Sequence, residues 1–330
     1  MRLRPKRQMR SIARMTRPAA SPYLTVALAG TAALLASAVL NRQLAKRAER
    51  RNPPEGSFVT VDGFDVHYVE RGAGRPLVLL HGNGSMLQDF ESSGLMDAFA
   101  SNHRVIAFDR PGFGHTKRPS GSKWGPNEQA DLFKAALGQL DASDAIVLGH
   151  SWGTAVAIAL GVRHPTVVGG LVLVSGYYFP TFRPDFLAIA APAIPFFGNL
   201  LSQTISPLVS RAMWPALLAK IFGPAKVPAK FAGFPEELAM RPTQIHAAAE
   251  ESALLIPSVA ALLKHYGKLG MPVTIIAGEQ DRLIDPTSQS ERLHREIGQS
   301  QYILVPSQGH MVHQTATDVV IGAIASLDER

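Results

Sequence analysis

Five residues near the middle of the chain, Gly149–Gly153 (Gly-His-Ser-Trp-Gly), constrain its fold more than any other feature. They follow the apolar run 144–148, which has the length of a strand, and precede the small, aliphatic run 154–160. A tight turn between a strand and a helix leaves little room for side chains two residues before and after its centre, which explains the two glycines. Ser151 would then project above the sheet, beside the amide that follows it. We therefore predict that this segment is a nucleophile elbow with Ser151 as the nucleophile.

Apolar segments of strand length recur on both sides of this turn, and stretches with helical spacing separate them. Strands that alternate with helices in this way form a mostly parallel sheet with helices on both faces. The pair Asp62-Gly63 between the first two strands indicates a hairpin. The predicted strands are 57–61, 65–70, 76–80, 105–108, 144–148, 170–175, 273–277 and 302–305, and the predicted helices are 86–100, 126–140, 154–160, 287–297 and 313–326.

The pattern changes between residues 177 and 268, where no run resembles a buried strand. This stretch contains apolar helical segments interrupted by prolines, and it is rich in phenylalanine. We interpret it as a helical cap inserted into the sheet domain. The predicted domains are therefore a first part of the core (57–176), the cap (177–268) and a second part of the core (269–330).

A serine nucleophile needs a base to take its proton and an acid to orient that base. In open α/β sheets such groups lie just beyond the carboxyl ends of strands. Asp281 follows the predicted strand that ends at Ala277, and His310 follows the strand that ends at Val305. Together with Ser151 they occur in the chain order Ser, Asp, His, which is the order of one known class of triad.

The developing oxyanion needs donors, and we predict that the backbone amides of Asn83 and Trp152 supply them. Asn83 lies in a glycine-rich segment after a predicted buried strand, and Trp152 follows the nucleophile. Two alternatives exist for the triad. Asp285 could replace Asp281, although it stands before a proline where a turn or helix cap is expected, and His313 could replace His310.

From about residue 57 to 330 the chain resembles the α/β-hydrolase superfamily, in its serine-dependent form with a helical cap. The segments that carry the resemblance are His81–Gly84, Asp109–Gly114, Gly149–Gly153, Gly278–Asp281 and Gly309-His310. The resemblance implies a Ser-His-Asp triad on a core sheet of about eight strands. It also implies that the cap shapes the pocket for the acyl or alcohol group, and that neither a metal nor a cofactor is used.

Some members of the superfamily differ from this chain at informative positions. Epoxide hydrolases and haloalkane dehalogenases resemble it around Asp109–Gly114, but they carry aspartate at the position of Ser151. The serine argues against those activities. Hydrolases of carbon–carbon bonds share the serine and the cap, but they often have a tryptophan after the catalytic histidine, where this chain has Met311.

The net charge of +7 comes from the N-terminal segment. Residues 1–52 contain 12 Lys and Arg and a single acidic residue, which leaves 21 basic and 25 acidic residues, a net charge of −4, in the remainder. A basic tail on an acidic globule does not indicate a nucleic-acid partner. The chain has no cysteine, which excludes disulfides and thiol nucleophiles.

No charged residue occurs between Arg17 and Arg42. These 24 residues would form roughly 36 Å of helix, enough to cross a ~30 Å hydrocarbon layer. We predict an uncleaved membrane anchor at about 18–41, and hence a membrane-associated protein. Two alternatives are a signal peptide cut after Ala36–Ala38, with export of the mature protein, and a helix that lies on the membrane surface.

These features favour a serine hydrolase of a small, lipophilic carboxylic ester. The alternatives are other chemistry on the same triad, such as carbon–carbon or amide hydrolysis, perhydrolysis or acyl transfer, and a ligand receptor without turnover.

Overall fold

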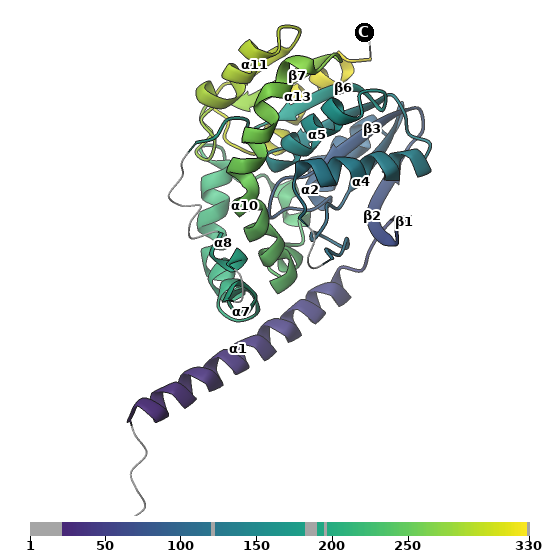
Figure 1. The fold of residues 1–330 in the computed structure, drawn as a ribbon. Coiled ribbons are helices and arrows are strands. Elements are labelled where there is room, and N and C mark those ends of the chain that lie inside the picture. The colour runs from purple at the N-terminus through teal and green to yellow at the C-terminus, as the bar shows by residue number, and fades with distance from the viewer. Residues whose placement is uncertain (1–21, 120–122, 182–189, 195–196, 329–330) are drawn as a thin grey trace, which may run out of the picture.

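The computed structural model describes residues 22–119, 123–181, 190–194 and 197–328. A central sheet of eight strands has the order β1-β2-β4-β3-β5-β6-β7-β8 (Figure 1). The contacts of β2 with β1 and β4 are antiparallel, and all other neighbours are parallel. The strands are β1 Ser57–Val61, β2 Phe64–Arg71, β3 Arg75–Leu80, β4 His103–Phe108, β5 Ala145–His150, β6 Val168–Val174, β7 Val273–Gly278 and β8 Gln301–Val305.

Helices cover both faces of the sheet because successive side chains of a strand point to opposite faces. In β3, Val78 and Leu80 pack in the cluster that includes α4 (Pro126–Gln139) and α5 (Trp152–Arg163). Leu77 and Leu79 pack on the other face, against α2 (Gln88–Ser93), α3 (Leu95–Phe99) and α13 (Thr317–Ala325). All four side chains are fully buried, as expected for a central parallel strand. The predicted α/β-hydrolase fold is confirmed.

The pairing register brings the carboxyl ends of several strands to the same edge of the sheet. Leu80 at the end of β3 pairs with Gly149 near the end of β5. At the other side of the sheet, Gly278 at the end of β7 pairs with Val305 at the end of β8. The loops that leave these strands therefore start at the same edge.

Three predicted helices are interrupted. The expected helix over 86–100 is divided into α2 and α3 at Gly94, whose left-handed φ of 84° ends the first helix. The segment 287–297 begins as a π-helical turn, Thr287–Glu291, before α11 (Arg292–Glu296). The last predicted helix is divided at Ala316 into α12 (Val312–Thr315) and α13.

Between β6 and β7 the described residues contain helices and helical turns and no strand. The helices are α7 (Phe197–Gln203), α8 (Ser206–Phe222), α9 (Glu236–Ala239) and α10 (Pro242–Leu262), and the 3₁₀ turns are Ala191–Ala193, Ala229–Gly233 and Leu263–Lys268. They lie together beside one end of the sheet (Figure 1). We retain 177–268 as the proposed limits of the cap. Two of the phenylalanines predicted for it, Phe186 and Phe196, lie outside the described residues.

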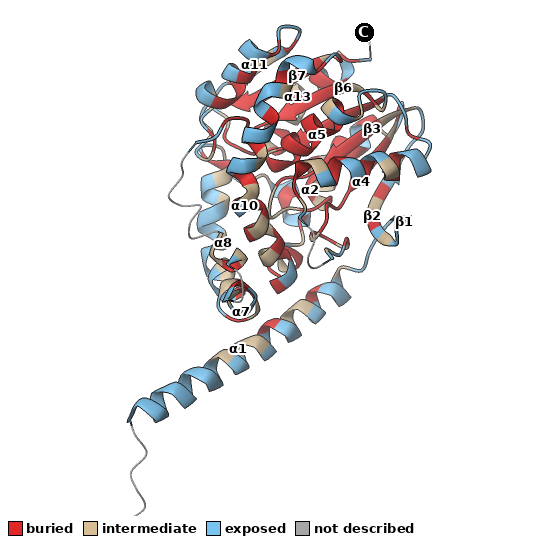
Figure 2. Ribbon diagram, viewed as in Figure 1, coloured by how far each residue is buried: buried red, intermediate tan, exposed pale blue. Residues whose placement is uncertain are grey.

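The N-terminal helix α1 (Pro22–Arg51) is 30 residues long and projects from the globule at its N-terminal half. That half is exposed along its length, whereas two residues of the other half, Asn41 and Ala48, are buried (Figure 2). Among the described residues, α1 and the segment 242–268 are long and apolar enough to cross a membrane, and 242–268 is partly buried in the cap. The basic residues before Pro22 and the first residues of the predicted anchor, 18–21, lie outside the described residues.

Candidate active site

Ser151 lies at the turn between β5 and α5 with a strained backbone. Its φ of 52° and ψ of −118° are rare for a residue with a side chain. A Cβ on Gly149 would collide with the main chain of Gly153, and a Cβ on Gly153 would collide with the main chain of Leu80. The two glycines thus permit the tight turn that the sequence predicted. Strain of this kind is found at functional sites.

Asp281 and His310 are in direct contact. Nδ1 of His310 lies 2.7 Å from Oδ2 of Asp281, and both side chains are almost fully buried. The other carboxylate oxygen, Oδ1, accepts hydrogen bonds from the amides of Leu283 (2.7 Å) and Ile284 (3.0 Å). The loop therefore fixes the carboxylate with one oxygen toward the imidazole. This contact keeps the proton on Nδ1, so that Nε2 is the nitrogen able to accept a proton.

The two alternative triad residues have other partners. Oδ2 of Asp285 accepts a hydrogen bond from the amide of Ser288 (2.8 Å), the helix-cap role expected of a residue before proline. Nε2 of His313 lies 3.0 Å from Oδ1 of Asp89 and not beside Asp281.

Ser151 is not in hydrogen-bond contact with His310. Among the described residues no hydrogen-bond partner is found for the Ser151 hydroxyl, and contacts of this kind often tighten only when substrate binds. His150 provides the link between the two loops, because its Nε2 donates to the main-chain oxygen of His310 at 3.2 Å. The main chain on the other side of His310 is also held, since its amide donates to the carbonyl of Ile221 in α8 (3.0 Å).

The loop after β3 lies directly beside the elbow. A Cβ on Gly82 would lie 3.1 Å from Cβ of Ser151. Among the turn, loop and cap hydrogen bonds of the described residues, none uses the amide of Asn83 or of Trp152. These amides are therefore available to a ligand, as an oxyanion hole requires.

The Asn83 side chain holds this loop against the cap. Its Nδ2 donates to the carbonyl of Ala248 and to the hydroxyl of Ser252, both at 3.0 Å and both on α10. A rigid loop is useful here because an oxyanion hole works through donors that are oriented before the reaction.

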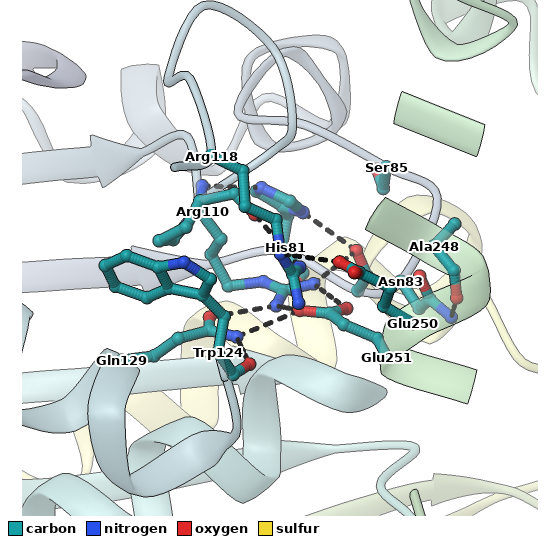
Figure 3. Close-up of polar contacts among 12 residues, drawn as sticks. His81, Asn83, Ser85, Arg110, Arg118, Trp124, Gln129, Ala248, Glu250 and Glu251 are labelled. Atoms are coloured by element: carbon teal, nitrogen blue, oxygen red, sulfur yellow. Dashed lines mark hydrogen bonds and ion pairs between the residues drawn. The ribbon is translucent and has the colours of Figure 1, made fainter. Parts of the chain in front are cut away.

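A buried arginine joins the same loop to α10, and the sequence reasoning missed it (Figure 3). Arg110 donates from Nε to the carbonyl of His81 (2.7 Å) and from Nη2 to the carbonyl of Gly82 (3.0 Å). The same guanidinium forms a two-pronged ion pair with Glu251 of α10, with Nη2 to Oε2 at 3.0 Å, and neither side chain is exposed. Gln129 also contacts both groups. An arginine within the Asp109–Gly114 segment was the available signal.

His81 belongs to this network as a neutral residue. Its Nδ1 donates to the carbonyl of Gly82 (2.8 Å), and its Nε2 accepts from the amide of Arg110 (3.0 Å). Burial, together with the positive charge of Arg110, lowers the pKa of His81 to about 3. The role expected of it within its own loop agrees with these contacts.

Asp89, His150 and His313 form a buried cluster below the elbow. Burial lowers the pKa of His150 well below its usual value, and the neighbouring His313 and His310 add to the effect. Burial alone would raise the pKa of Asp89, but His313 holds it below its usual value. The donor atoms of the three residues lie within 4.8 Å of one another, so among the described residues they are the group that could hold a metal ion.

A sequence model of the alpha/beta hydrolase fold matches residues 75–317, which is most of the chain. The protein belongs to the α/β-hydrolase family. The match spans every segment described above, from the end of the hairpin to the helix after His310.

Two curated relatives illustrate the similarity in sequence. The 2-hydroxymuconate semialdehyde hydrolase of Pseudomonas sp. (strain CF600) is 33% identical over 136 residues, which is 40% of this chain and 48% of the relative. That match therefore spans about half of the relative's length. Haloalkane dehalogenase 2 of Mycobacterium tuberculosis is 27% identical over 272 residues, which is 78% of this chain and 90% of the relative.

Solved structures share the fold at lower identity. A membrane phospholipase A, a bacterial virulence factor, is 20% identical with a TM-score of 0.65 and covers 93% of this chain and 96% of its own. The epoxide hydrolase CorEH is 21% identical with a TM-score of 0.68, and covers 83% and 98%. The relatives include several kinds of hydrolase, so they support a hydrolase and leave its bond type open.

Proposed function

We propose that this hydrolase is a membrane-associated serine esterase that cleaves a lipophilic carboxylic ester with Ser151, His310 and Asp281. The observation that carries the proposal is the 2.7 Å contact between His310 and Asp281 at the edge of the sheet where the strained turn presents Ser151. A serine with an imidazole base and a buried carboxylate is the arrangement that acyl transfer uses.

In the proposed mechanism, His310 takes the proton of Ser151 through Nε2 while Asp281 holds its Nδ1–H. Ser151 attacks the ester carbonyl, and the amides of Asn83 and Trp152 stabilise the tetrahedral oxyanion. His310 then protonates the leaving alcohol. Water activated by the same imidazole releases the acid from the acyl-enzyme.

The identity of residue 151 separates this chain from part of its family. Haloalkane dehalogenase 2 is among the similar proteins, but the aspartate nucleophile expected of that activity is a serine here. An alkoxide attack on a carbonyl is the reaction that a serine in this place supports, and an ester is the most common substrate for it.

A second candidate is hydrolysis of a carbon–carbon bond on the same triad. The 33% identity with a 2-hydroxymuconate semialdehyde hydrolase favours it. Turnover of that semialdehyde faster than any ester would select this second function.

Membrane association is proposed from α1. The helix is continuous from Pro22 to Arg51, through the alternative cleavage site Ala36–Ala38, and Ser37 itself donates a hydrogen bond to Thr204 of the cap (2.7 Å). Cleavage after Ala38 would remove that contact, so we favour the uncleaved anchor over the signal peptide. The exposed, apolar N-terminal half of α1 is suited to hydrocarbon and not to water.

The test is hydrolysis of p-nitrophenyl esters of increasing acyl length by the full chain in detergent micelles, with Ser151→Ala as the background. We expect ester cleavage that depends on Ser151 and increases from acetate to longer acyl chains. Cleavage at the same rate in the variant, or no cleavage of any ester, would contradict the proposal.

A further inference from the structure

An apolar surface on the cap lies beside the predicted anchor. Six side chains of α7, the start of α8 and the residue before them are exposed, with Phe197 68% exposed. We call them the α7–α8 patch: Ile194, Phe197, Leu200, Ile205, Leu208 and Val209. Exposed apolar side chains that gather in this way mark an interaction surface.

The patch is attached to one particular level of α1. Nδ2 of Asn41, a fully buried residue, donates to the carbonyls of Gln203 (3.1 Å) and Thr204 (2.6 Å). Ser37 also donates to the carbonyl of Thr204. These carbonyls belong to the C-terminal end of α7 and would otherwise lack partners, so α1 caps α7. Figure 1 shows α7 as the cap element beside the middle of α1.

The same level is the boundary between the apolar and basic parts of α1. Residues 22–41 contain no charge, and these 20 residues form about 30 Å of helix, the thickness of a hydrocarbon layer. Exposed basic side chains follow at once, at Arg42, Lys46, Arg47 and Arg50. Such residues are favourable at the level of lipid headgroups, and more so with anionic lipids.

We propose that the α7–α8 patch inserts into the headgroup region of the membrane that α1 crosses. The proposal rests on the anchor within the proposed function. If α1 spans the hydrocarbon with Asn41 at its edge, the contacts of Asn41 and Ser37 bring the patch to that edge. Apolar side chains at this depth replace water by the boundary between headgroups and acyl chains, as in helices that lie on membranes.

This arrangement has a consequence for the substrate. α8 begins in the patch and ends at Phe222, and the carbonyl of Ile221 near its end accepts the amide of His310. One helix thus connects the membrane edge with the loop that carries the proposed base. An ester dissolved in the bilayer would meet the cap without first entering water, which fits a lipophilic substrate.

The absence of cysteine allows a direct test with single-cysteine variants of the full chain. A polarity-sensitive fluorophore is attached at Phe197→Cys or Val209→Cys in vesicles of phosphatidylcholine and phosphatidylglycerol. Leu28→Cys reports on the anchor, and Glu296→Cys, at the exposed end of α11, is the control on the far side of the globule. Quenching is measured with lipids that carry a nitroxide near the headgroup.

We expect blue-shifted emission and loss of intensity by lipid quenching at positions 197 and 209, and at position 28, but not at 296. If position 28 is quenched while positions 197 and 209 behave like 296, the anchor stands and the proposal is wrong. If position 28 is not quenched, both are wrong. Shielding of 197 and 209 without lipid quenching would indicate a protein partner, such as a second copy, and would also overturn the proposal. Ester hydrolysis of a soluble substrate is measured separately, so failure of the esterase assignment remains distinguishable.

Discussion

Asp281 and Asp285 are only four residues apart, yet their carboxylates have different partners. Asp281 contacts the imidazole of His310, whereas Asp285 accepts the amide of Ser288 at the start of a helical turn. The sequence alone left both as candidates for the acid of the triad. Their separation makes them a matched pair for mutation.

We predict that Asp281→Asn lowers kcat by about 10⁴-fold, because an amide in place of the carboxylate no longer selects the tautomer with a free Nε2. Asp285→Asn should leave kcat unchanged and cost about 1 kcal/mol of stability at most, as for a weakened helix cap. Both variants are assayed with the same ester, and their unfolding is followed by circular dichroism. Equal losses of kcat in the two variants would contradict the assignment of the acid.

At the scale of single residues, the sequence predicted the positions that depend on local geometry. Gly149 and Gly153 are required by the turn itself, and the elbow was recognised from them. Arg110 was missed because its partner, Glu251, is 141 residues away in the cap. Local spacing carries no information on which distant carboxylate will neutralise a buried guanidinium.

At the scale of elements, α10 is connected to the loop after β3 through Arg110 and Asn83. Glu251 and Glu250 are neighbours on α10 with contrasting surroundings. Glu251 is fully buried against Arg110, whereas Glu250 is partly exposed and pairs with Arg118 (2.9 Å). The buried pair holds the cap helix and the proposed oxyanion loop together.

We predict that Glu251→Gln lowers the free energy of unfolding by about 3–5 kcal/mol, because it leaves the buried charge of Arg110 without its counter-charge. Glu250→Gln should change the same quantity by about 0–1 kcal/mol, as is usual for a pair near the surface. Chemical denaturation followed by tryptophan fluorescence measures both. Similar values for the two variants would show that the buried pair does not hold the cap on the core.

The regular elements followed from hydrophobic patterning more closely than their interruptions did. Continuous apolar runs predicted the buried parallel strands, and burial on both faces explains why. The divisions at Gly94 and Ala316 were not expected. Apolar spacing continues across both positions, and the end of a helix there depends on the conformation of one residue.

At the scale of the whole molecule, the α/β-hydrolase fold could be predicted, but the relation between α1 and the cap could not. Composition indicated an apolar N-terminal helix, and its length matched a membrane. Nothing in the pattern indicated that Asn41 would be buried against the end of α7, because a lone asparagine after an apolar run reads as a polar boundary. The contact became visible only when the two segments were placed together.

The central claim is that Ser151 is an activated nucleophile, and covalent labelling with a fluorophosphonate tests it most directly. Ser175→Ala is the matched control, since Ser175 is also buried, follows β6 and has a φ of 50°, but it is not part of the proposed triad. We predict one adduct per chain, located by peptide mass spectrometry at Ser151, retained in Ser175→Ala and lost in Ser151→Ala. An adduct at another residue, or equal labelling of folded Ser151→Ala, would contradict the account.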